Sequence, residues 1–426
     1  MFRPMKALSS AGYGLASSAY FLALVVLAIR VGREWLEPGP EKTAPLDTED
    51  RRLAWKLVAF AYLYSVLFFL SLYALLIALQ GEYGFGFFVR GFSFWDGGRY
   101  LQLAGEGYAA SGEDAKNIVF PPLYPAALAL TSLAVPLARA PFVLNALLLA
   151  PLVLLFFRLA RLDLDRLTAC RATLLWIVVP LSHLRLATYS ETLFSVLLLA
   201  AMYEARAGCW VRSGAASFAM ALTRSTGYFV WPALAIEYVL GTRGREGRLR
   251  LRDRRHLYLL AVPAAALAYL GINFWLFGDP LAFLGYQKSI WNKQPASFLD
   301  GLATAVQPHG WEDLKALLTQ RNAEATALLF AILMTLWSSL RLRPSYGIMM
   351  ACCVFFFTST TWVLSTPRYI SVFFPIPMLL ADGITRVGDR RGAPGISRVL
   401  LGLLLSIDVA LALTYASWFV RAKWAF

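Results

Sequence analysis

The chain has 426 residues, of which 58% are hydrophobic and only 15% are charged, and its formal net charge is +14. Soluble globular proteins carry roughly 25% charged residues, so this composition excludes an ordinary soluble domain. The arginines cluster in short loops between apolar stretches, which is the positive-inside pattern of membrane proteins rather than the basic face of a nucleic-acid-binding protein. We therefore expect an integral membrane protein without a nucleic-acid partner.

Eight apolar stretches are long enough to cross a hydrocarbon core of about 30 Å as helices. They comprise residues 12–31, 56–80, 141–158, 257–277, 322–340, 346–364, 369–386 and 399–420. No stretch alternates with a period of two, so a transmembrane barrel is not expected. The first stretch lacks a convincing cleavage site after it and is interpreted as a retained span.

The region between residues 122 and 241 is less regular. Its first part, residues 122–139, is rich in proline and is expected to lie at the outer membrane surface or to re-enter without crossing. The apolar stretches that follow are residues 167–181, 191–207, 211–223 and 228–241. With the eight clear spans, they predict an all-α, polytopic transmembrane bundle of about 12 spans, with interfacial helices in the first outer loop.

Basic loops set the expected orientation of this bundle. Four loops are predicted to be cytoplasmic, namely residues 158–166, 243–255, 341–343 and 386–398. The second of these holds seven arginines, which are Arg243, Arg245, Arg248, Arg250, Arg252, Arg254 and Arg255. Five segments are then placed together on the outer side, namely residues 81–121, 182–190, 223–227, 278–321 and 365–368.

The first outer segment contains the strongest candidate for chemistry. It reads Phe94-Trp95-Asp96-Gly97-Gly98-Arg99-Tyr100. A carboxylate beside a tryptophan at the membrane surface is partly desolvated, which raises its pKa and makes it a better general base. Gly97 and Gly98 are interpreted as room for a ligand to approach the backbone. An ordinary Asp-Gly-Gly turn is the alternative interpretation.

This segment, together with Gly107-Tyr108 and Phe120-Pro121-Pro122-Leu123-Tyr124-Pro125, resembles the first lumenal loop of the PIG-V type mannosyltransferases of the GT-C superfamily. Four further segments resemble motifs of the same family in the same order. They are residues 189–194 (YSETLF), 221–227 (ALTRSTG), 277–283 (FGDPLAF, followed by Gln287 and Trp291) and 367–375 (PRYISVFFP). Together they extend over about residues 90–378. The span at residues 12–31 precedes the family's usual first helix.

The resemblance implies a single membrane glycosyltransferase domain over residues 1–426. Within it, residues 1–55 form an extra N-terminal span and cytoplasmic loop, residues 56–241 a GT-C-like catalytic module, and residues 242–426 the C-terminal helices. The implied reaction transfers a sugar, by resemblance mannose, from a polyprenyl- or dolichyl-phosphate carrier to a glycan, glycolipid or protein acceptor, with inversion. The carrier is a co-substrate, and no cofactor or metal is expected. The location would be the plasma membrane in a bacterium or the endoplasmic reticulum in a eukaryote.

In this interpretation Asp96 accepts the acceptor's proton, and basic side chains stabilise the leaving phosphate. The residues expected to bind substrate are Trp95, Arg99, Tyr100, Arg185, Tyr189, Glu191, Arg224, Gln287, Lys288, Trp291, Arg368 and Tyr369. Several also have a structural alternative: Arg185 and Arg224 can be interfacial anchors, and Lys288 can simply face solvent. An aromatic belt explains Trp95, Trp291 and Tyr369 as well, and Glu191 can be a helix-terminal charge. His183 is expected to be a hydrogen-bonded interfacial histidine rather than a proton carrier.

Two other functions compete with the glycosyltransferase. A transporter or flippase of a lipid-linked or anionic substrate would place its ionisable residues near mid-bilayer between inverted repeats. A structural or assembly protein would tolerate the loss of its outer charges. The sequence contains no visible repeat and gathers its polar chemistry on one predicted side, which favours the enzyme.

Overall fold

The computed structural model describes residues 3–37, 46–246, 254–306, 320–390 and 394–423. Within these residues every regular element is helical, apart from an isolated bridge between Pro295 and Thr360. The expectation of an all-α protein is therefore confirmed. Some arginines of the predicted cytoplasmic loops, such as Arg248, Arg250 and Arg252, and the part of the outer segment at 307–319 lie outside the described residues.

Six described helical segments are long and apolar enough to cross a membrane, which indicates a multi-pass integral membrane protein. They comprise α1 (Arg3–Leu36), α2 (Thr48–Gln80), α6 (Ala140–Asp163), α11 (Ala261–Phe277), α15 (Gln320–Arg341) and α19 (Pro394–Phe419). Only 17% of the most apolar window of α2 and 11% of that of α19 are buried. Most apolar side chains of α2 and α19 therefore face outward, where lipid would cover them.

The prediction of about twelve spans is wrong, since the described chain contains only six helices of this kind. The remaining apolar stretches form helices of 13–16 residues. These helices are α7 (Arg166–Val178), α8 (Glu191–Arg206), α9 (Trp210–Thr223), α10 (Trp231–Glu246), α16 (Pro344–Thr358) and α18 (Pro375–Arg390). At 1.5 Å per residue they extend about 20–24 Å, less than a hydrocarbon core of about 30 Å. Their side chains are apolar largely because other helices cover them.

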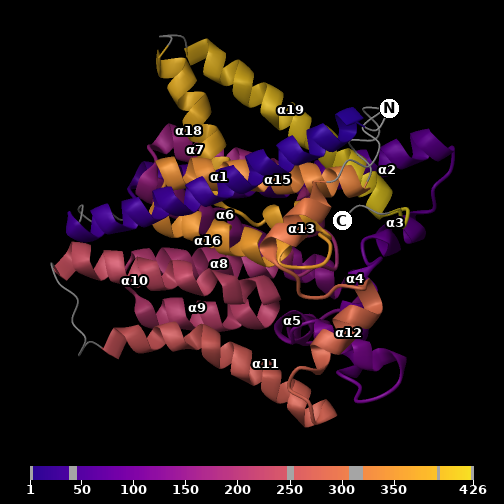
Figure 1. Ribbon diagram of the computed structural model, residues 1–426. Coiled ribbons are helices and arrows are strands. Elements are labelled where there is room, and N and C mark those ends of the chain that lie inside the picture. Colours follow the sequence, from indigo (N-terminus) through magenta and orange to yellow (C-terminus); the bar gives the residue numbers. More distant parts are fainter. Residues whose placement is uncertain (1–2, 38–45, 247–253, 307–319, 391–393, 424–426) are drawn as a thin grey trace.

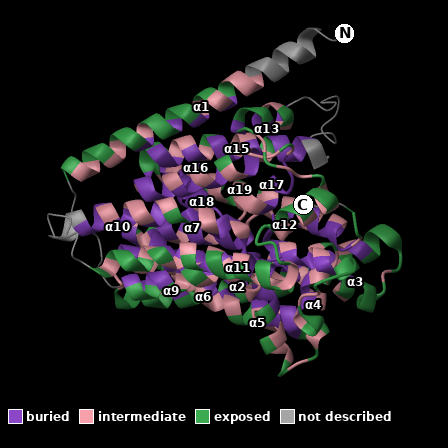
Figure 2. Ribbon diagram, turned by 60° about the horizontal axis from the view of Figure 1, so that its bottom comes forward, coloured by how far each residue is buried: buried purple, intermediate pink, exposed green. Residues whose placement is uncertain are grey.

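Burial is concentrated in these shorter helices. Figure 2 shows buried residues concentrated in α7, α16 and α18, whereas α1 crosses the outside of the bundle with much of its surface exposed. In the core, Trp176 of α7 stacks on Phe156 of α6 with ring centroids 5.1 Å apart. The bundle is thus built as an inner set of short helices surrounded by longer ones.

Short elements gather at one end of the bundle, at the right of Figure 1. They include α3 (Phe85–Gly91), α4 (Asp96–Glu106), η1 (Glu113–Val119), α5 (Leu123–Ser132), η3 (Ser182–Arg185), η4 (Ser225–Val230), α12 (Ala282–Trp291), α13 (Phe298–Ala305) and α17 (Thr366–Ile370). With ten residues, α5 is about 15 Å long and too short to cross a bilayer, as expected from its prolines. Apart from α5, which lies in the proline-rich residues 122–139, these elements begin in the five segments predicted to share the outer side.

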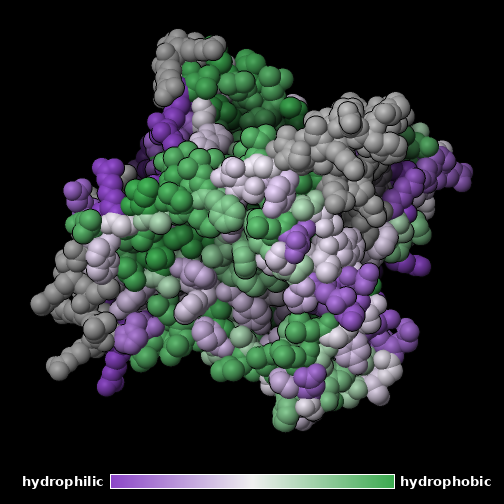
Figure 3. Space-filling model, in the orientation of Figure 1, coloured by the Kyte–Doolittle hydropathy of each residue, from purple (hydrophilic) through white to green (hydrophobic). Residues whose placement is uncertain are grey.

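Charged side chains gather at the other end of the bundle. There Arg206 donates to the Asp163 carboxylate over 3.0 and 3.1 Å, and Arg343 donates to Glu237 over 2.7 and 2.6 Å. The C-terminal ends of α6, α8 and α15 meet here, so the arginines also face the negative ends of helix dipoles. On the face drawn in Figure 3, hydrophobic residues cover the middle, and hydrophilic ones lie mainly toward the left and right ends.

Candidate functional site

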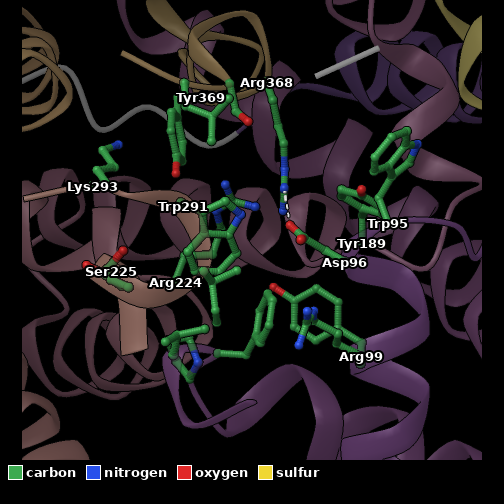
Figure 4. A pocket seen from close by; sticks show the side chains of 18 of the residues that line it. Trp95, Asp96, Arg99, Tyr189, Arg224, Ser225, Trp291, Lys293, Arg368 and Tyr369 are labelled. Carbon is green, nitrogen blue, oxygen red and sulfur yellow. Dashed lines mark hydrogen bonds and ion pairs between the residues drawn. The ribbon is translucent and has the colours of Figure 1, made fainter. Parts of the chain in front are cut away.

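A cavity of about 340 Å³ opens among the short elements at the first of these ends. Its lining includes ten of the predicted site residues, namely Trp95, Asp96, Arg99, Tyr100, Tyr189, Arg224, Gln287, Trp291, Arg368 and Tyr369. Apart from Tyr369, which directly follows the last of them, they come from the five segments that were predicted to lie on the outer side, and each segment contributes at least one. Figure 4 shows that Asp96, Arg224 and Arg368 point toward one another across this cavity.

Asp96 is held at the first position of α4 by a tight local structure. The preceding residue, Trp95, has a φ of 58°, a region that non-glycine residues rarely adopt. Phe92 accepts a backbone hydrogen bond from Thr188 over 2.9 Å. A Cβ atom on Gly97 would lie 3.3 Å from Cβ of Thr188, so this glycine permits close packing of two chain segments. The interpretation of Gly97 as room for a ligand is therefore replaced by a packing role.

Two arginines and two carboxylates form a buried cluster in the cavity. Arg368 Nη1 donates to Asp96 Oδ2 over 2.5 Å, and its Nε donates to Glu191. Arg224 Nη1 donates to the same Glu191 oxygen and, over 3.1 Å, to Ser190 Oγ. The guanidinium carbon of Arg368 lies 4.3 Å from the centre of the Tyr189 ring. Both arginines therefore have fixed orientations, as phosphate recognition by a planar guanidinium requires.

The position of Arg224 depends on a sharp turn between α9 and η4. A Cβ atom on Gly227 would lie 2.8 Å from Cα of Ala221 and 2.9 Å from the Met220 carbonyl oxygen. Only glycine fits so close to the neighbouring backbone. The Thr-Arg-Ser-Thr-Gly motif thus turns the chain back on the end of α9 and presents Arg224 to the cavity.

Arg368 is presented by α17, whose start adopts an unusual backbone conformation. Ser365 has a φ of 64°, in the left-handed region. Its backbone N–H and that of Thr366 each donate to the carboxylate of Glu324 over 2.6 Å. No local pattern of residues singles out Glu324, because it stands at the start of an apolar stretch far from Arg368 along the chain.

Lys293 also lines the cavity and was not predicted. It follows α12 on a segment that pairs with residues 359–362. Ala296 N donates to the Ser359 carbonyl over 3.1 Å, and Thr361 N donates to the Gln294 carbonyl over 2.9 Å. This pairing brings Lys293 to the wall of the cavity, at the side opposite Arg99 in Figure 4.

Charge in the cavity is positive on balance. Its lining carries four cations, Arg99, Arg224, Lys293 and Arg368, against one carboxylate, Asp96. The buried carboxyl groups of Glu191 and Glu324 stand behind this lining and do not outweigh its four cations. Positive charge next to a partly buried carboxylate is suited to an anionic ligand and to a second molecule whose hydroxyl gives up a proton.

Tyr100 contributes a neutral hydroxyl to the same wall. Burial raises the pKa of Tyr100 to about 12, so the phenol stays protonated at physiological pH. Its oxygen lies 3.3 Å from Ser190 Oγ, and its ring packs edge-on against Phe120 with centroids 4.9 Å apart. Tyr100 is therefore a hydrogen-bonding wall residue, and Asp96 is the carboxylate of the cavity lining.

Three predicted residues are not in the cavity lining. Glu191 lies behind it, bonded to both arginines. Lys288 is exposed on α12, because Gln287, Ile290 and Trp291 occupy the helix face toward the cavity and Lys288 points about 100° away from Gln287. Arg185 donates to the Ile177 carbonyl oxygen over 2.6 Å at the end of α7. Burial lowers the pKa of Arg185 to about 10, and its contacts indicate a structural role.

His183 lies outside the cavity and differs from expectation. It is fully buried against Phe419, with ring centroids 5.4 Å apart. Neither ring nitrogen has a hydrogen-bond partner in the described part of the chain, so the hydrogen-bonded histidine that was predicted is not observed. Burial lowers the pKa of His183 to about 3, so the ring is neutral at physiological pH.

Among the described residues, no group of three or more His, Cys, Asp or Glu side chains is arranged to hold a metal ion. Comparison with known proteins adds no assignment. The chain matches no protein-family model, no curated protein and no solved structure. The function of the chain is therefore inferred from the residues of the cavity.

Proposed function

We propose that this chain is a lipid-linked-sugar glycosyltransferase of the GT-C type, with Asp96 as its general base. The observation that carries the proposal is the cluster in which Arg368 joins Asp96 to Glu191, while Arg224 holds Glu191 from the other side. It supplies two oriented guanidinium groups for a phosphate and one carboxylate for a proton. The cavity lies at one end of a bundle whose long helices are apolar, which is where a lipid-borne substrate would arrive.

The proposed reaction begins when the carrier's phosphate binds Arg224 and Arg368. A phosphate that takes the Nη1 group of Arg368 releases Asp96 from its ion pair. Asp96 then takes the proton of the acceptor hydroxyl, whose oxygen attacks the anomeric carbon from the face opposite the leaving group. The bond from that carbon to the phosphate oxygen breaks, and the electron pair leaves on a polyprenyl phosphate that has gained a negative charge.

The two arginines would act mainly on this developing charge. Electrostatic groups that are fixed before the reaction stabilise a transition state without reorganising during it. The guanidinium groups are already fixed by Glu191, Ser190 and the ring of Tyr189. Trp95 and Trp291, on the walls of the cavity, would stack on the sugar, which by resemblance is mannose.

The test is a transfer assay with purified protein, polyprenyl-phosphate-mannose and a panel of glycolipid, glycan and peptide acceptors. The Asp96→Asn variant preserves the size of the side chain and removes the proton acceptor. We expect transfer to fall by about 10²–10⁴-fold, the usual contribution of general base catalysis. Asp114→Asn, in the exposed part of η1, is the matched control and should retain wild-type transfer.

Two results would contradict the proposal. One is full activity of an Asp96→Asn variant that keeps the elution volume and thermal stability of the wild type. The other is movement of the sugar lipid across liposomes by wild-type protein with no sugar transfer to any acceptor, which would support the flippase alternative.

A further inference from the structure

Glu324 connects helix α15 to the start of α17, the short helix that carries Arg368. Its side chain is 95% buried at the N-terminal end of α15, a helix that otherwise packs against α1 and α16. The carboxylate accepts hydrogen bonds from the backbone N–H groups of Ser365 and Thr366, each over 2.6 Å. Three residues after Ser365, Arg368 reaches into the cavity.

The link held by Glu324 needs an external partner to keep its conformation. Ser365 has a φ of 64°, which costs a serine free energy relative to the ordinary regions of backbone space. Among the described residues, the side-chain hydroxyl of Ser365 does not cap α17. The two N–H groups at the start of this helix are satisfied instead by the two oxygens of a single carboxyl group from another helix.

A glutamate suits this position better than its neutral relatives. Both N–H groups donate, so the partner must offer two acceptor oxygens on one side chain. A glutamine offers one acceptor oxygen, and its NH₂ group would face the second N–H group. An aspartate offers two oxygens but is shorter by one methylene. The geometry of the link is therefore specified by the two acceptor oxygens and the length of residue 324.

We infer that Glu324 is a positioning residue for Arg368: it fixes the Ser365–Thr366 link and thereby sets where the Arg368 guanidinium meets the lipid phosphate. The identity of the ligand rests on the proposed function, whereas the effect of Glu324 on the Ser365–Thr366 link does not. The ligand class is a polyprenyl phosphate, and Glu324 acts on it only through Arg368.

The first measurement is hydrogen–deuterium exchange of peptides that cover residues 362–370, in wild-type protein and Glu324→Gln without any ligand. We expect the Ser365 and Thr366 amides to exchange at least tenfold faster in the variant, since one of the two hydrogen bonds to residue 324 is lost. Asp165→Asn is the matched control, because Asp165 also accepts two backbone N–H groups at a helix start, from Leu167 and Thr168, at the other end of the bundle. It should leave exchange at residues 362–370 unchanged.

The second measurement is a double-mutant cycle on the binding of polyprenyl monophosphate, with Glu324→Gln, Arg368→Lys and the double variant. Glu324→Gln alone should weaken binding roughly tenfold, the effect of losing one buried hydrogen bond that positions Arg368. In the Arg368→Lys background the same substitution should have less than a twofold effect. Glu324→Asp should recover part of the binding lost in Glu324→Gln.

The outcomes separate the inference from the proposed function. Unchanged exchange at residues 362–370, or additive losses of binding in the cycle, would overturn the positioning role. Faster exchange in Glu324→Gln, combined with no binding of polyprenyl phosphate by the wild type, would instead overturn the proposed function while leaving Glu324 as the residue that holds the link. Faster exchange together with non-additive binding supports both.

Discussion

Arg368 and Asp96 form an ion pair over 2.5 Å although they are 272 positions apart in the sequence. The pair joins the first outer segment to the link that precedes α18 and α19. Arg368 also donates to Glu191, so Asp96 and Glu191 are bonded to the same arginine. A phosphate that binds here must displace Asp96 from Arg368, so binding of the donor and release of the base are one event in the proposed mechanism.

Replacement of Arg368 by lysine tests this coupling. The Arg368→Lys variant keeps the positive charge but loses the fork that contacts Asp96 and Glu191 at once. We expect kcat for sugar transfer to fall by about 10²-fold, the usual cost of removing one oriented group that stabilises transition-state charge. Arg212→Lys, at a side chain that is 66% exposed beside Glu204, should have wild-type kcat. Equal kcat in both variants would contradict a role for the fork.

Lys293 should act on donor binding more than on the chemical step. Lys293 lines the cavity and makes no ion pair within the described chain, although its charge acts on the buried Glu324 carboxyl, so Lys293→Gln removes a cation without breaking an ion pair. We expect the KM for the polyprenyl-phosphate sugar to rise roughly fivefold, which corresponds to about 1 kcal/mol for a half-exposed charge. The increase should shrink at high salt concentration. Lys288→Gln, five residues earlier and exposed, is the control, and an equal rise in KM there would show that overall charge alone matters.

Gly227 should be intolerant of any side chain. Its added Cβ would lie within 2.9 Å of two backbone atoms, so Gly227→Ala forces the turn that carries Arg224 to move. We expect a loss of about 1–3 kcal/mol in the free energy of unfolding, as overpacking usually costs, together with reduced transfer. Gly402→Ala, in the long helix α19 with no atom within 4 Å of its added Cβ, should be neutral in thermal unfolding. A fully stable and active Gly227→Ala variant would contradict this account of the turn.

His183 should make the folded state sensitive to acid. Its pKa is lowered to about 3 by burial, whereas an unfolded histidine titrates near its ordinary value of about 6.5. Between these values the unfolded chain binds one more proton than the folded chain, so stability falls as the pH drops below 6.5, by about 2 kcal/mol at pH 5. His183→Leu should remove this part of the difference in apparent melting temperature between pH 7.5 and pH 5.0.

The exposed residue His256 provides the control for that measurement. His256→Leu should keep the wild-type dependence of melting temperature on pH. If His183→Leu also kept it, the buried ring would not be the group that binds the extra proton on unfolding.

Several features followed from the sequence alone, because they depend on local composition. Long apolar stretches specify helices, since every backbone polar group in lipid must be bonded within its own segment. The positions of the basic loops predicted that five polar segments share one side. Residues of all five segments line one cavity, and Asp96, Arg224 and Arg368 are among them. Placing segments on a shared side requires only counting helices and charges.

Other features were decided by tertiary packing. An apolar stretch has the same composition whether lipid or neighbouring helices cover it. The prediction from sequence therefore counted α7–α10, α16 and α18 as spans, although these helices are short and internal. Lys293 replaces Lys288 in the cavity because α12 ends at Trp291 and the chain then pairs with residues 359–362. Glu324 matters only because α15 places it against Ser365. These contacts join distant parts of the chain, and no local pattern of residues encodes them.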